Sequence, residues 1–529
     1  MMKHAFLFQL LIIGLLTQSW SQEKKPEVLF GKKEPASKFA TLHEIVGYDA
    51  TGVYALKYMG KPWSISDPTI HQYELVHYDD SMNLVNSLAL KLKTEKKFRK
   101  LEFIFYSNGA LHVFSSFKNK KQKKKYLFVE TVDKHSMTFN NDLRKISEID
   151  YSEHSRANTG EFSYNISRDS SKVMIYMEAL YQGQEKERFE VCVLDESLNK
   201  LWEKPITLPY SDRLFNIQKF EVDDHGNAYI LGKRYKDSFR EEANGMPNFQ
   251  YHLLGYLNEG KQVQDYPLEL QGILPVNIEF DFTSDQKIVC AGFYANLGAS
   301  KESSIHIKGT YYVVIDPETK QVLTRAAAQL GFDHKVRKVK RVRTVSMNTS
   351  HLKGGDISEL DLGDLIIRRD GGTVLIGEES YSKSYSSQNS SHTYYYHKDI
   401  VVISLSPNGN IEWTLKISKN QKTLDEDVAL SSYLPVVVGD KIHILYNDSH
   451  LNMELESGEE IHQYTAGGGQ LTILATIDKT GKLTKRELIN SKEAKAYIEL
   501  RVSNQQTDKE VILFGKRFKM HCMAKVTFP

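Results

Sequence analysis

The stretch EVDDHGNAYILGKRYKDSFREEANGMPNFQYHLLGYLNEGKQVQDYPLEL, residues 221–270, contains three strand-like runs separated by turns. The turn DDHG at 223–226 precedes an apolar and aromatic run, and the turn NEG at 258–260 separates two further runs, at 251–257 and 263–270. Asn, Asp and Gly tolerate the backbone conformations of tight turns, whereas β-branched and aromatic residues favour strands. Together with a candidate strand just before it, at 215–222, the stretch predicts a four-stranded antiparallel unit.

The same order of runs and turns recurs along most of the chain. We count eight units, whose first strands begin near residues 44, 101, 162, 215, 278, 360, 433 and 498. The eighth unit has three clear strands, and the run at 27–31 supplies a fourth, which would place both ends of the chain in one sheet. This pattern predicts an all-β fold, a β-propeller of eight blades closed by its N-terminal strand, because closure removes exposed sheet edges.

Other folds fit the repeat less well. Seven blades are the alternative if the weak second unit is misread. A parallel β-helix would show much shorter repeats, and stacked β-sandwiches would not show one template along the whole chain. Glycines also recur at corresponding places in the second strands, where they would let another backbone approach closely: Gly232, Gly292, Gly377 and Gly515.

The first twenty-one residues have the composition of a secretory signal. Lys3 precedes an apolar run at 5–16, and Ser19 and Ser21 offer small side chains before a cleavage site that would leave Gln22 as the new N-terminus. An apolar run of twelve residues is too short to cross about 30 Å of hydrocarbon. We therefore expect a signal peptide at 1–21 and one propeller domain at 22–529 that does not span a membrane and resides in the periplasm.

Charge and cysteine content restrict the function further. With 69 Lys and Arg against 67 Asp and Glu, the net charge is +2, so we expect no nucleic-acid partner. The three cysteines, Cys192, Cys290 and Cys522, each lie in a strand-like run. An odd number cannot pair completely, and we expect buried free thiols.

Catalytic motifs are absent from the sequence. It contains no G-x-S-x-G, no H-E-x-x-H and no P-loop, so we predict no catalytic residue, no cofactor and no metal site. His443, His450 and His462 are expected to be loop histidines. Trp202 and Trp413 occupy corresponding positions, but a quinone-dependent dehydrogenase would repeat such a Trp in most blades, so we expect them to pack in the core. Carboxylate-based glycoside chemistry stays open, because the catalytic acids of a propeller lie far apart in sequence.

Two basic segments are not explained by the strands and turns of the repeated units. The segment Lys118–Lys125 holds six lysines in eight residues, where we expect a solvated hairpin tip. A longer insertion at about 331–359, between the fifth and sixth units, alternates valine with basic residues, as an edge strand or a short helix with one cationic face would. Long loops in compact folds are often functional, so we take six of its residues as candidates for binding an acidic protein partner: Lys335, Arg337, Lys338, Lys340, Arg341 and Arg343. A passive insertion is the alternative.

Several segments resemble a family of exported proteins. SRDSSKVMIYMEAL (167–180), FEVDDHGNAYILGKRY (220–235) and DLIIRRDGGTVLIGEESY (364–381) are similar to blade motifs of exported β-propellers from bacteria with a type IX secretion system. The resemblance covers most of the chain after residue 21, but its motifs mark blades and not an activity. It implies a non-enzymatic protein-binding scaffold, and one role that fits is the periplasmic plug subunit of the type IX outer-membrane translocon. The alternative is a propeller enzyme or carbohydrate-binding protein with a site in the central funnel.

Overall fold

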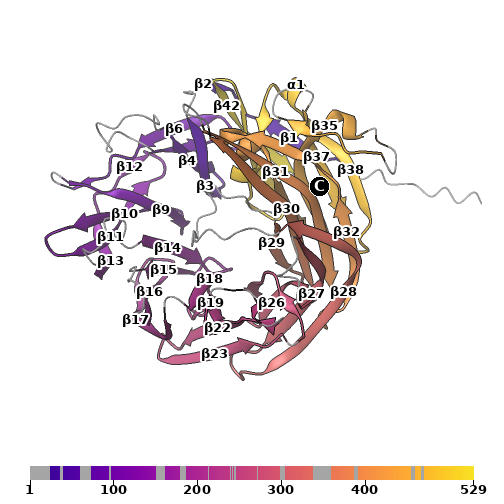
Figure 1. Ribbon diagram of the computed structural model, residues 1–529. Coiled ribbons are helices and arrows are strands. Elements are labelled where there is room, and N and C mark those ends of the chain that lie inside the picture. The colour runs from indigo at the N-terminus through magenta and orange to yellow at the C-terminus, as the bar shows by residue number, and fades with distance from the viewer. Residues whose placement is uncertain are drawn as a thin grey trace, which may run out of the picture.

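Eight sheets, whose main strands pair antiparallel, stand around a ring, as Figure 1 shows, so the expected eight-bladed β-propeller is confirmed. The predicted signal peptide at 1–21 lies outside the residues that the structure describes. The computed structural model describes residues 24–35, 40–59, 73–94, 97–150, 161–178, 186–211, 214–238, 240, 242–243, 246–270, 272–297, 304–337, 359–386, 391–453, 455, 459–465 and 470–529.

Blades 1, 3 and 4 are plain four-stranded meanders, and blade 2 adds one short strand to this pattern. Blade 1 contains β3 (Thr41–Asp49), β4 (Gly52–Tyr58), β5 (Tyr73–Tyr78) and β6 (Leu84–Ala89). Blade 2 contains β9 (Lys100–Ser107), β10 (Ala110–Asn119), β11 (Lys124–Asp133) and β13 (Arg144–Asp150), with the short β12 (Thr138–Phe139) beside β11. Blade 3 contains β14 (Glu161–Ile166), β15 (Lys172–Glu178), β16 (Lys186–Asp195) and β17 (Lys200–Ser211). Blade 4 contains β18 (Phe215–Val222), β19 (Ala228–Tyr235), β22 (Phe249–Leu257) and β23 (Gln262–Leu268).

Blades 5, 6 and 8 carry additional strands, whereas blade 7 has four. Blade 5 contains β25 (Glu279–Phe282), β26 (Ile288–Ala295), β27 (Ser304–Ile315) and β28 (Val322–Arg337), with β24 (Leu274–Pro275) beside β26. Blade 6 contains β29 (Glu359–Ile367), β30 (Thr373–Ser386), β31 (Ser391–Leu405) and β32 (Ile411–Ile417), with β33 (Gln421–Leu424) beside β31 and β36 (Tyr464–Thr465) beside β33. Blade 7 contains β34 (Tyr433–Val438), β35 (Lys441–Ser449), β37 (Gln470–Ile477) and β38 (Leu483–Asn490). Blade 8 combines β1 (Glu27–Phe30), β2 (Glu34–Pro35), β39 (Tyr497–Ile498), β40 (Asn504–Gln505), β41 (Glu510–Arg517) and β42 (Met520–Thr527).

The remaining described elements are short. Two small hairpins pair β7 (Lys93–Thr94) with β8 (Lys97–Phe98) and β20 (Glu242–Ala243) with β21 (Met246–Pro247). The helices are α1 (Ser491–Ala494) and the 3-10 turns η2 (Asp425–Leu430), η3 (His450–Met453) and η4 (Leu500–Val502). Over the described part of the chain, no helix has the length and apolar character needed to cross a membrane.

The N-terminal strand closes the ring, as the sequence predicts. β1 pairs antiparallel with β42, with Glu27 opposite Thr527 and Phe30 opposite Ala524. The chain then passes beside blade 1, where the buried ammonium of Lys57 lies 2.9 Å from Glu34 Oε2. The first and last strands of the described chain therefore belong to one sheet, in which β1 is the outer strand of blade 8 and covers the edge of β42.

The apolar core lies between neighbouring blades. One cluster of buried side chains joins blades 1 and 2, another joins blades 4 and 5, and a third joins blade 1 to blade 8. The largest cluster runs through blades 6, 7 and 8 and includes contacts from β1. Because each sheet buries both faces against its neighbours, its central strands are apolar on both sides, which explains the nearly continuous hydrophobic runs in the sequence.

The predicted close approach of a backbone is confirmed at Gly292, whereas the near neighbours of Gly232 and Gly515 are side chains. A Cβ on Gly292 would lie 2.1 Å from the carbonyl oxygen of Asn277, so a neighbouring backbone does approach it closely. At Gly232 the close neighbour is instead the ring of Phe215, whose Cζ would be 1.9 Å away. The glycines of the second strands therefore make room for aromatic rings as well as for backbone.

Blade 6 contains a buried charged cluster that no motif indicated. Lys419 follows β32 and is buried; its Nζ lies 2.5 Å from Glu378 Oε1 and donates a hydrogen bond to Gln421 Oε1 at 3.0 Å. Glu378 Oε2 lies 2.7 Å from Nδ1 of the buried His397 and accepts a hydrogen bond from Ser432 Oγ at 2.8 Å. Burial opposes ionisation of Glu378, yet Lys419 and His397 together lower its pKa to about 2.

The three thiols are free and buried, as expected. Burial raises the pKa of each, that of Cys290 to about 12, so thiolate is scarce at neutral pH. We therefore predict that a thiol reagent reacts with none of Cys192, Cys290 and Cys522 in the native protein and with all three in denaturant without reductant. A mass two hydrogens below that of the reduced chain would show a disulfide and contradict this prediction.

Candidate functional site

A cavity of about 970 Å³ opens on one end of the ring. That end, called here the turn face, carries the turns that join the first to the second strand and the third to the fourth strand of each blade. The cavity lies among the β29–β30, β34–β35 and β40–β41 turns of blades 6, 7 and 8. Arg168 of blade 3 also lines it, and its Nη1 donates to Phe282 O of blade 5 at 2.6 Å. Since blade 3 stands across the ring from blade 7, the cavity reaches the centre of the turn face.

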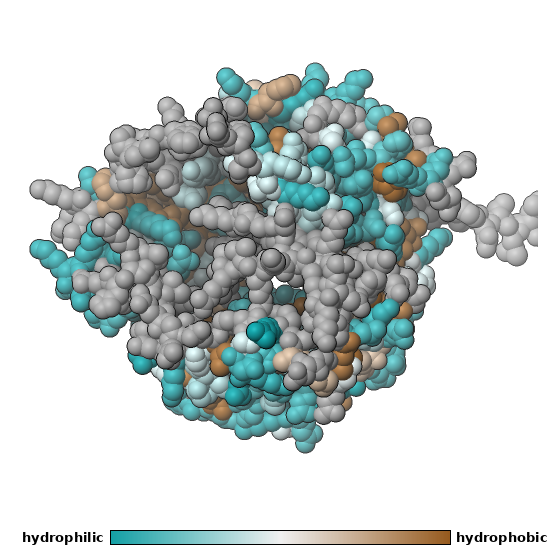
Figure 2. All heavy atoms as spheres, viewed as in Figure 1, coloured by the Kyte–Doolittle hydropathy of each residue, from teal (hydrophilic) through white to brown (hydrophobic). Residues whose placement is uncertain are grey.

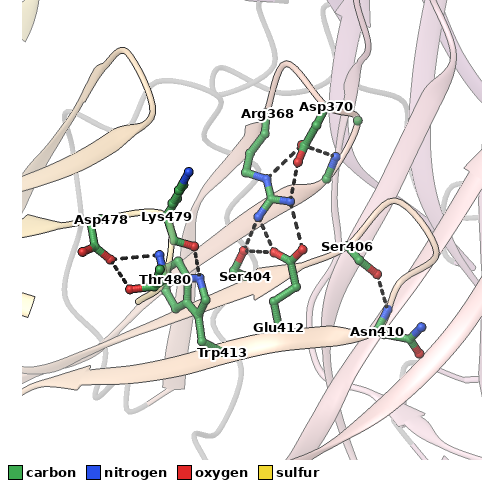
Figure 3. Close-up of polar contacts among 12 residues, drawn as sticks. Arg368, Asp370, Ser404, Ser406, Asn410, Glu412, Trp413, Asp478, Lys479 and Thr480 are labelled. Atoms are coloured by element: carbon green, nitrogen blue, oxygen red, sulfur yellow. Dashed lines mark hydrogen bonds and ion pairs between the residues drawn. The ribbon is translucent and has the colours of Figure 1, made fainter. Parts of the chain in front are cut away.

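Arg368, in the β29–β30 turn, organises one wall of the cavity (Figure 3). Its Nε and Nη2 donate to the two carboxylate oxygens of Asp370 at 3.0 and 2.8 Å. Its Nη1 donates to Ser404 Oγ at 2.6 Å and to Glu412 Oε2, and its Nη2 donates to Glu412 Oε1 at 3.2 Å. All five guanidinium N–H groups are thus occupied within the wall. Arg368 fixes the two carboxylates, and it has no donor left for a ligand.

The carboxyl groups of this wall are held in their ionised form. The hydrogen bonds and charge of Arg368 lower the pKa of both Asp370 and Glu412. Hydrogen bonds from Thr480 and from the backbone of Lys482 lower the pKa of Asp478 in the adjacent turn of blade 7. None of these three groups carries a proton near neutral pH, so none can serve as a general acid there.

Trp413 joins this wall to the next blade. Its Nε1 donates to Lys479 O at 3.1 Å, and a Cβ on Gly481 would lie 2.7 Å from its Cγ, so the indole packs directly on the β37–β38 turn of blade 7 (Figure 3). Trp202 of blade 3 packs on Gly260, in the corresponding turn of blade 4, in the same way. Both tryptophans have the packing role that the sequence predicts, and each holds a blade against the one that follows.

The rim of the cavity presents both signs of charge. Arg369, Asp440 and Asp508 are exposed at the tips of the three turns. Behind them, the side-chain amide of Gln505 accepts from Val437 N at 2.9 Å and donates to Val437 O at 2.8 Å, which joins blades 7 and 8. The cavity therefore has rigid walls and a charged rim, a combination suited to binding a ligand that carries both charges.

A second set of charged groups lies on the first strands of the blades, which run nearest the centre of the ring in Figure 1. Lys219 Nζ lies 2.9 Å from Glu221 Oε1 and 3.0 Å from Glu279 Oε2. Tyr433 donates to Asp364 Oδ2 at 2.9 Å. Burial raises the pKa of Glu221 and Asp364, and it raises that of the half-buried Glu44 to about 7. The first strands of the blades thus carry carboxyl groups of the kind that a proton-transfer site would need.

The predicted basic site is not near this cavity. Lys335 and Arg337 are in β28, where they pair with His306 and Ser304 of β27. The other four candidates, Lys338, Lys340, Arg341 and Arg343, lie outside the described residues. Gly331 does not begin a loop, because β28 continues through Arg337; as far as this residue the segment forms an edge strand, one of the two forms expected, since β28 is the outer strand of blade 5. β28 runs away from the turn face, so its end lies on the opposite face. The role of these six residues in binding stays a prediction.

The lysine-rich hairpin and His443, the other residues considered from the sequence, are among the residues that the structure describes. Lys125, in the lysine-rich hairpin, is buried and lies 3.1 Å from Glu102, whereas Lys120 and Lys121 are exposed at the tip. His443 is a buried strand residue, 2.9 Å from Thr476 Oγ1, and is not the loop histidine that we expected. Within the described residues, no three His, Cys, Asp or Glu side chains come together as metal ligands would.

The sequence indicates some residues of the cavity, but it does not indicate that they lie together in one site. The turn at 369–372 and Trp413 were identified as blade features. Two polar residues in otherwise apolar strands could have indicated that the turn and Trp413 lie close together. They are Ser404, within an apolar strand, and Glu412, just before the tryptophan. Both accept hydrogen bonds from Arg368, which precedes the turn.

Comparisons with known proteins give remote likenesses. No protein-family model matches the chain, and no curated protein matches it. Among solved structures, the polysaccharide lyase Uly1 gives a TM-score of 0.36 at 9% identity, over 96% of this chain and 100% of that one. The WD40 domain of SCAP from fission yeast gives 0.34 at 9% identity, over 94% of each chain. A protein of unknown function from Dyadobacter fermentans gives 0.26 at 8% identity, over 70% of this chain and 94% of that one.

Proposed function

We propose that this chain is an exported, non-enzymatic β-propeller that binds a protein partner at the turn-face cavity. The observation that carries the proposal is the wall around Arg368. Its carboxylates are ionised and fixed by an arginine with no free donor. Such a wall offers shape and charge to a bound segment, and its ionised carboxyl groups have no proton to donate to a substrate.

The setting of this function is also a proposal. The signal-like residues 1–21 support export, and the blade motifs resemble exported propellers of bacteria with type IX secretion. We therefore place the protein in the periplasm, as a scaffold subunit of an outer-membrane secretion complex. The resemblance alone supports the link to the type IX translocon.

Affinity purification from the native envelope, with mass spectrometry, tests the proposal. The first variant reverses the exposed rim charges, Arg369→Glu, Asp440→Lys and Asp508→Lys. We expect it to lose the main partner while its thermal unfolding stays unchanged, because exposed charges add little to stability. The control variant, Glu259→Lys with Lys261→Glu, reverses an exposed pair on a blade 4 turn of the same face and should keep the partner.

A second arm tests the sequence-predicted site. It replaces Lys335, Arg337, Lys338, Lys340, Arg341 and Arg343 with Ser. Loss of the partner in this arm alone would move the interface to the extended β27–β28 hairpin and away from the cavity. If the rim variant recovers the same partners in the same yield as the unaltered protein, binding at the cavity is refuted.

The alternative is a propeller enzyme or carbohydrate-binding protein with a central-funnel site. Glu44 favours it, because a carboxyl group with a pKa of about 7 is suited to proton transfer near neutral pH. Polysaccharide hydrolysis by the native chain that disappears in Glu44→Gln would establish the enzyme and overturn the non-enzymatic proposal.

A further inference from the structure

The β30–β31 hairpin extends well beyond the other strands of blade 6 (Figure 1). β29 accompanies β30 only as far as Ser380, and the following residues pair with β31 alone. On its other edge this part of β31 pairs with β33. The result is a three-stranded projection that the blade core does not require.

One side of this projection is built of tyrosines. Tyr381 pairs with Tyr396, which pairs with Lys422 on β33, and the next row places Lys383 opposite Tyr394. Directly opposite residues in an antiparallel pair point to the same side of the sheet. The rings of Tyr381 and Tyr396 stack with centroids 4.5 Å apart and planes inclined by 12°.

The outermost row completes the surface. Tyr385 pairs with His392, and its ring meets Tyr394 edge to face at 5.7 Å. Tyr385 is 58% exposed, and the other three rings are half-buried. We call Tyr381, Tyr385, Tyr394 and Tyr396 the tyrosine face.

Three lysine ammonium groups lie over these rings. Lys422 Nζ is 4.7 Å from the Tyr394 centroid, Lys383 Nζ is 5.6 Å from that of Tyr381, and Lys398 Nζ is also 5.6 Å from that of Tyr381. Among the described residues, no carboxylate forms an ion pair with any of these three lysines. An ammonium group held on a ring keeps N–H donors for a further partner.

The nearby carboxylate of Asp425 is already occupied. Its Oδ2 lies 2.9 Å from Nδ1 of His392, and its Oδ1 accepts from Thr393 N at 2.8 Å. The tyrosine face thus carries three lysine ammonium groups without a carboxylate partner in the described ranges, next to phenol hydroxyls and ring edges. Its charge complement is a partner rich in carboxylates.

We propose that the tyrosine face binds an acidic polysaccharide, a chain of sugars that carry carboxylate groups. Tyrosine offers an apolar ring edge to sugar C–H groups and a hydroxyl to sugar hydroxyls, and lysine offers a compact charge to the carboxylates. Successive rows lie about 7 Å apart along the strands, so the face is long enough to contact several linked sugars.

The chemistry of the face favours a glycan over an acidic protein. Protein interfaces gain most of their affinity from a few anchors that become fully desolvated in pockets. Here the rings already stack on one another, and their edges are partly exposed at the surface of the projection. A flat surface of this kind suits a hydrated, flexible chain of hydroxyl and carboxylate groups.

Affinity electrophoresis tests the proposal with the full chain. Gels contain polygalacturonate as the acidic glycan or dextran as the neutral one, at physiological ionic strength so that general charge attraction is screened. We expect polygalacturonate to retard the unaltered protein and dextran to leave it unretarded. Tyr385→Ser with Tyr394→Ser should weaken binding roughly tenfold, as should alanine at Lys383, Lys398 and Lys422.

The control removes three lysines elsewhere, with alanine at Lys120, Lys121 and Lys123 in the exposed blade 2 hairpin tip. It should bind polygalacturonate as the unaltered protein does. Equal loss in this control would show non-specific attraction, and unchanged binding in the tyrosine variant would show that the face is not the site. If poly-glutamate displaces polygalacturonate at equal carboxylate concentration, the occupant is an acidic peptide and the glycan proposal is refuted. Melting temperatures within error of the unaltered protein exclude misfolding of the variants.

Discussion

Removal of residues 24–35 should lower the free energy of unfolding by about 3–6 kcal/mol, the value expected for exposing two large apolar side chains and a sheet edge. The deletion removes β1, whose Val28 and Phe30 pack against the core of blades 6 to 8, and it leaves β42 without its outer partner. It also leaves the buried ammonium of Lys57 without Glu34. Chemical denaturation followed by intrinsic fluorescence measures the effect.

Substitutions within β1 distinguish packing from chain length. Val28→Ser with Phe30→Ser should reproduce most of the loss, because both side chains face the core. Glu27→Ser with Leu29→Ser changes the two exposed positions of the same strand and should cost far less. A synthetic peptide of residues 24–35 should restore stability to the deleted protein. Unchanged stability after the deletion would refute the closure role of β1.

Lys419→Met should destabilise the protein by about 3–5 kcal/mol, the cost of leaving one partner of a buried ion pair alone. The substitution keeps the length of the side chain but leaves Glu378 charged within the core. Lys416→Met is the matched control, since Lys416 pairs with Asp399 at the surface of the same blade, with 48% of its side chain exposed. That control should change stability by about 0–1 kcal/mol.

The double variant Glu378→Gln with Lys419→Met distinguishes the effect of an unpaired buried charge from the other effects of replacing Lys419. It removes both charges, so it should be more stable than Lys419→Met alone. A double variant less stable than either single variant would contradict the assignment of an ion pair. Both measurements use the same denaturation assay.

The same cluster predicts instability in acid. The pKa of Glu378 is about 2 in the folded state against 4.5 for an ordinary glutamate, so its contribution is fully present above about pH 4.5 and is lost as the pH falls towards 2. Burial lowers the pKa of His397 in the folded protein below 6.5. As the pH falls, His397 is therefore protonated in the unfolded chain before it is protonated in the folded protein, and stability begins to fall below about pH 6.5. Glu378→Gln should flatten the lower part of this pH profile.

The sequence predicts the strands well because each blade repeats a local pattern. Even the weak second unit is a full blade, whose outer strand β13 is formed by Arg144–Asp150. The closing strand was also predictable, because the eighth unit lacked one strand and the N-terminus offered one. The blade 5 hairpin was misjudged, because basic residues after Gly331 suggested a loop where β28 continues.

The cavity and the tyrosine face could not be read from the chain in the same way. Each depends on which residues of different blades or strands lie side by side, as Arg368 lies beside Ser404 and Glu412. Lys419 and Glu378 look like ordinary surface charges in the sequence, yet both are buried. The type of a residue indicates which interactions its side chain can form. Whether that side chain is buried against others or exposed to solvent depends on its neighbours in the folded ring.

Ring closure also has a consequence for the order of folding. Lys33, just after β1, donates to the carbonyl of Ala494, which is 461 residues further along the chain. A chain made from its N-terminus must therefore hold β1 unpaired while seven blades form, and long-range strand pairing of this kind is slow. Closure should be the last and slowest step of folding, and until it is complete the nascent chain keeps one extended end available to chaperones or to a transport machinery.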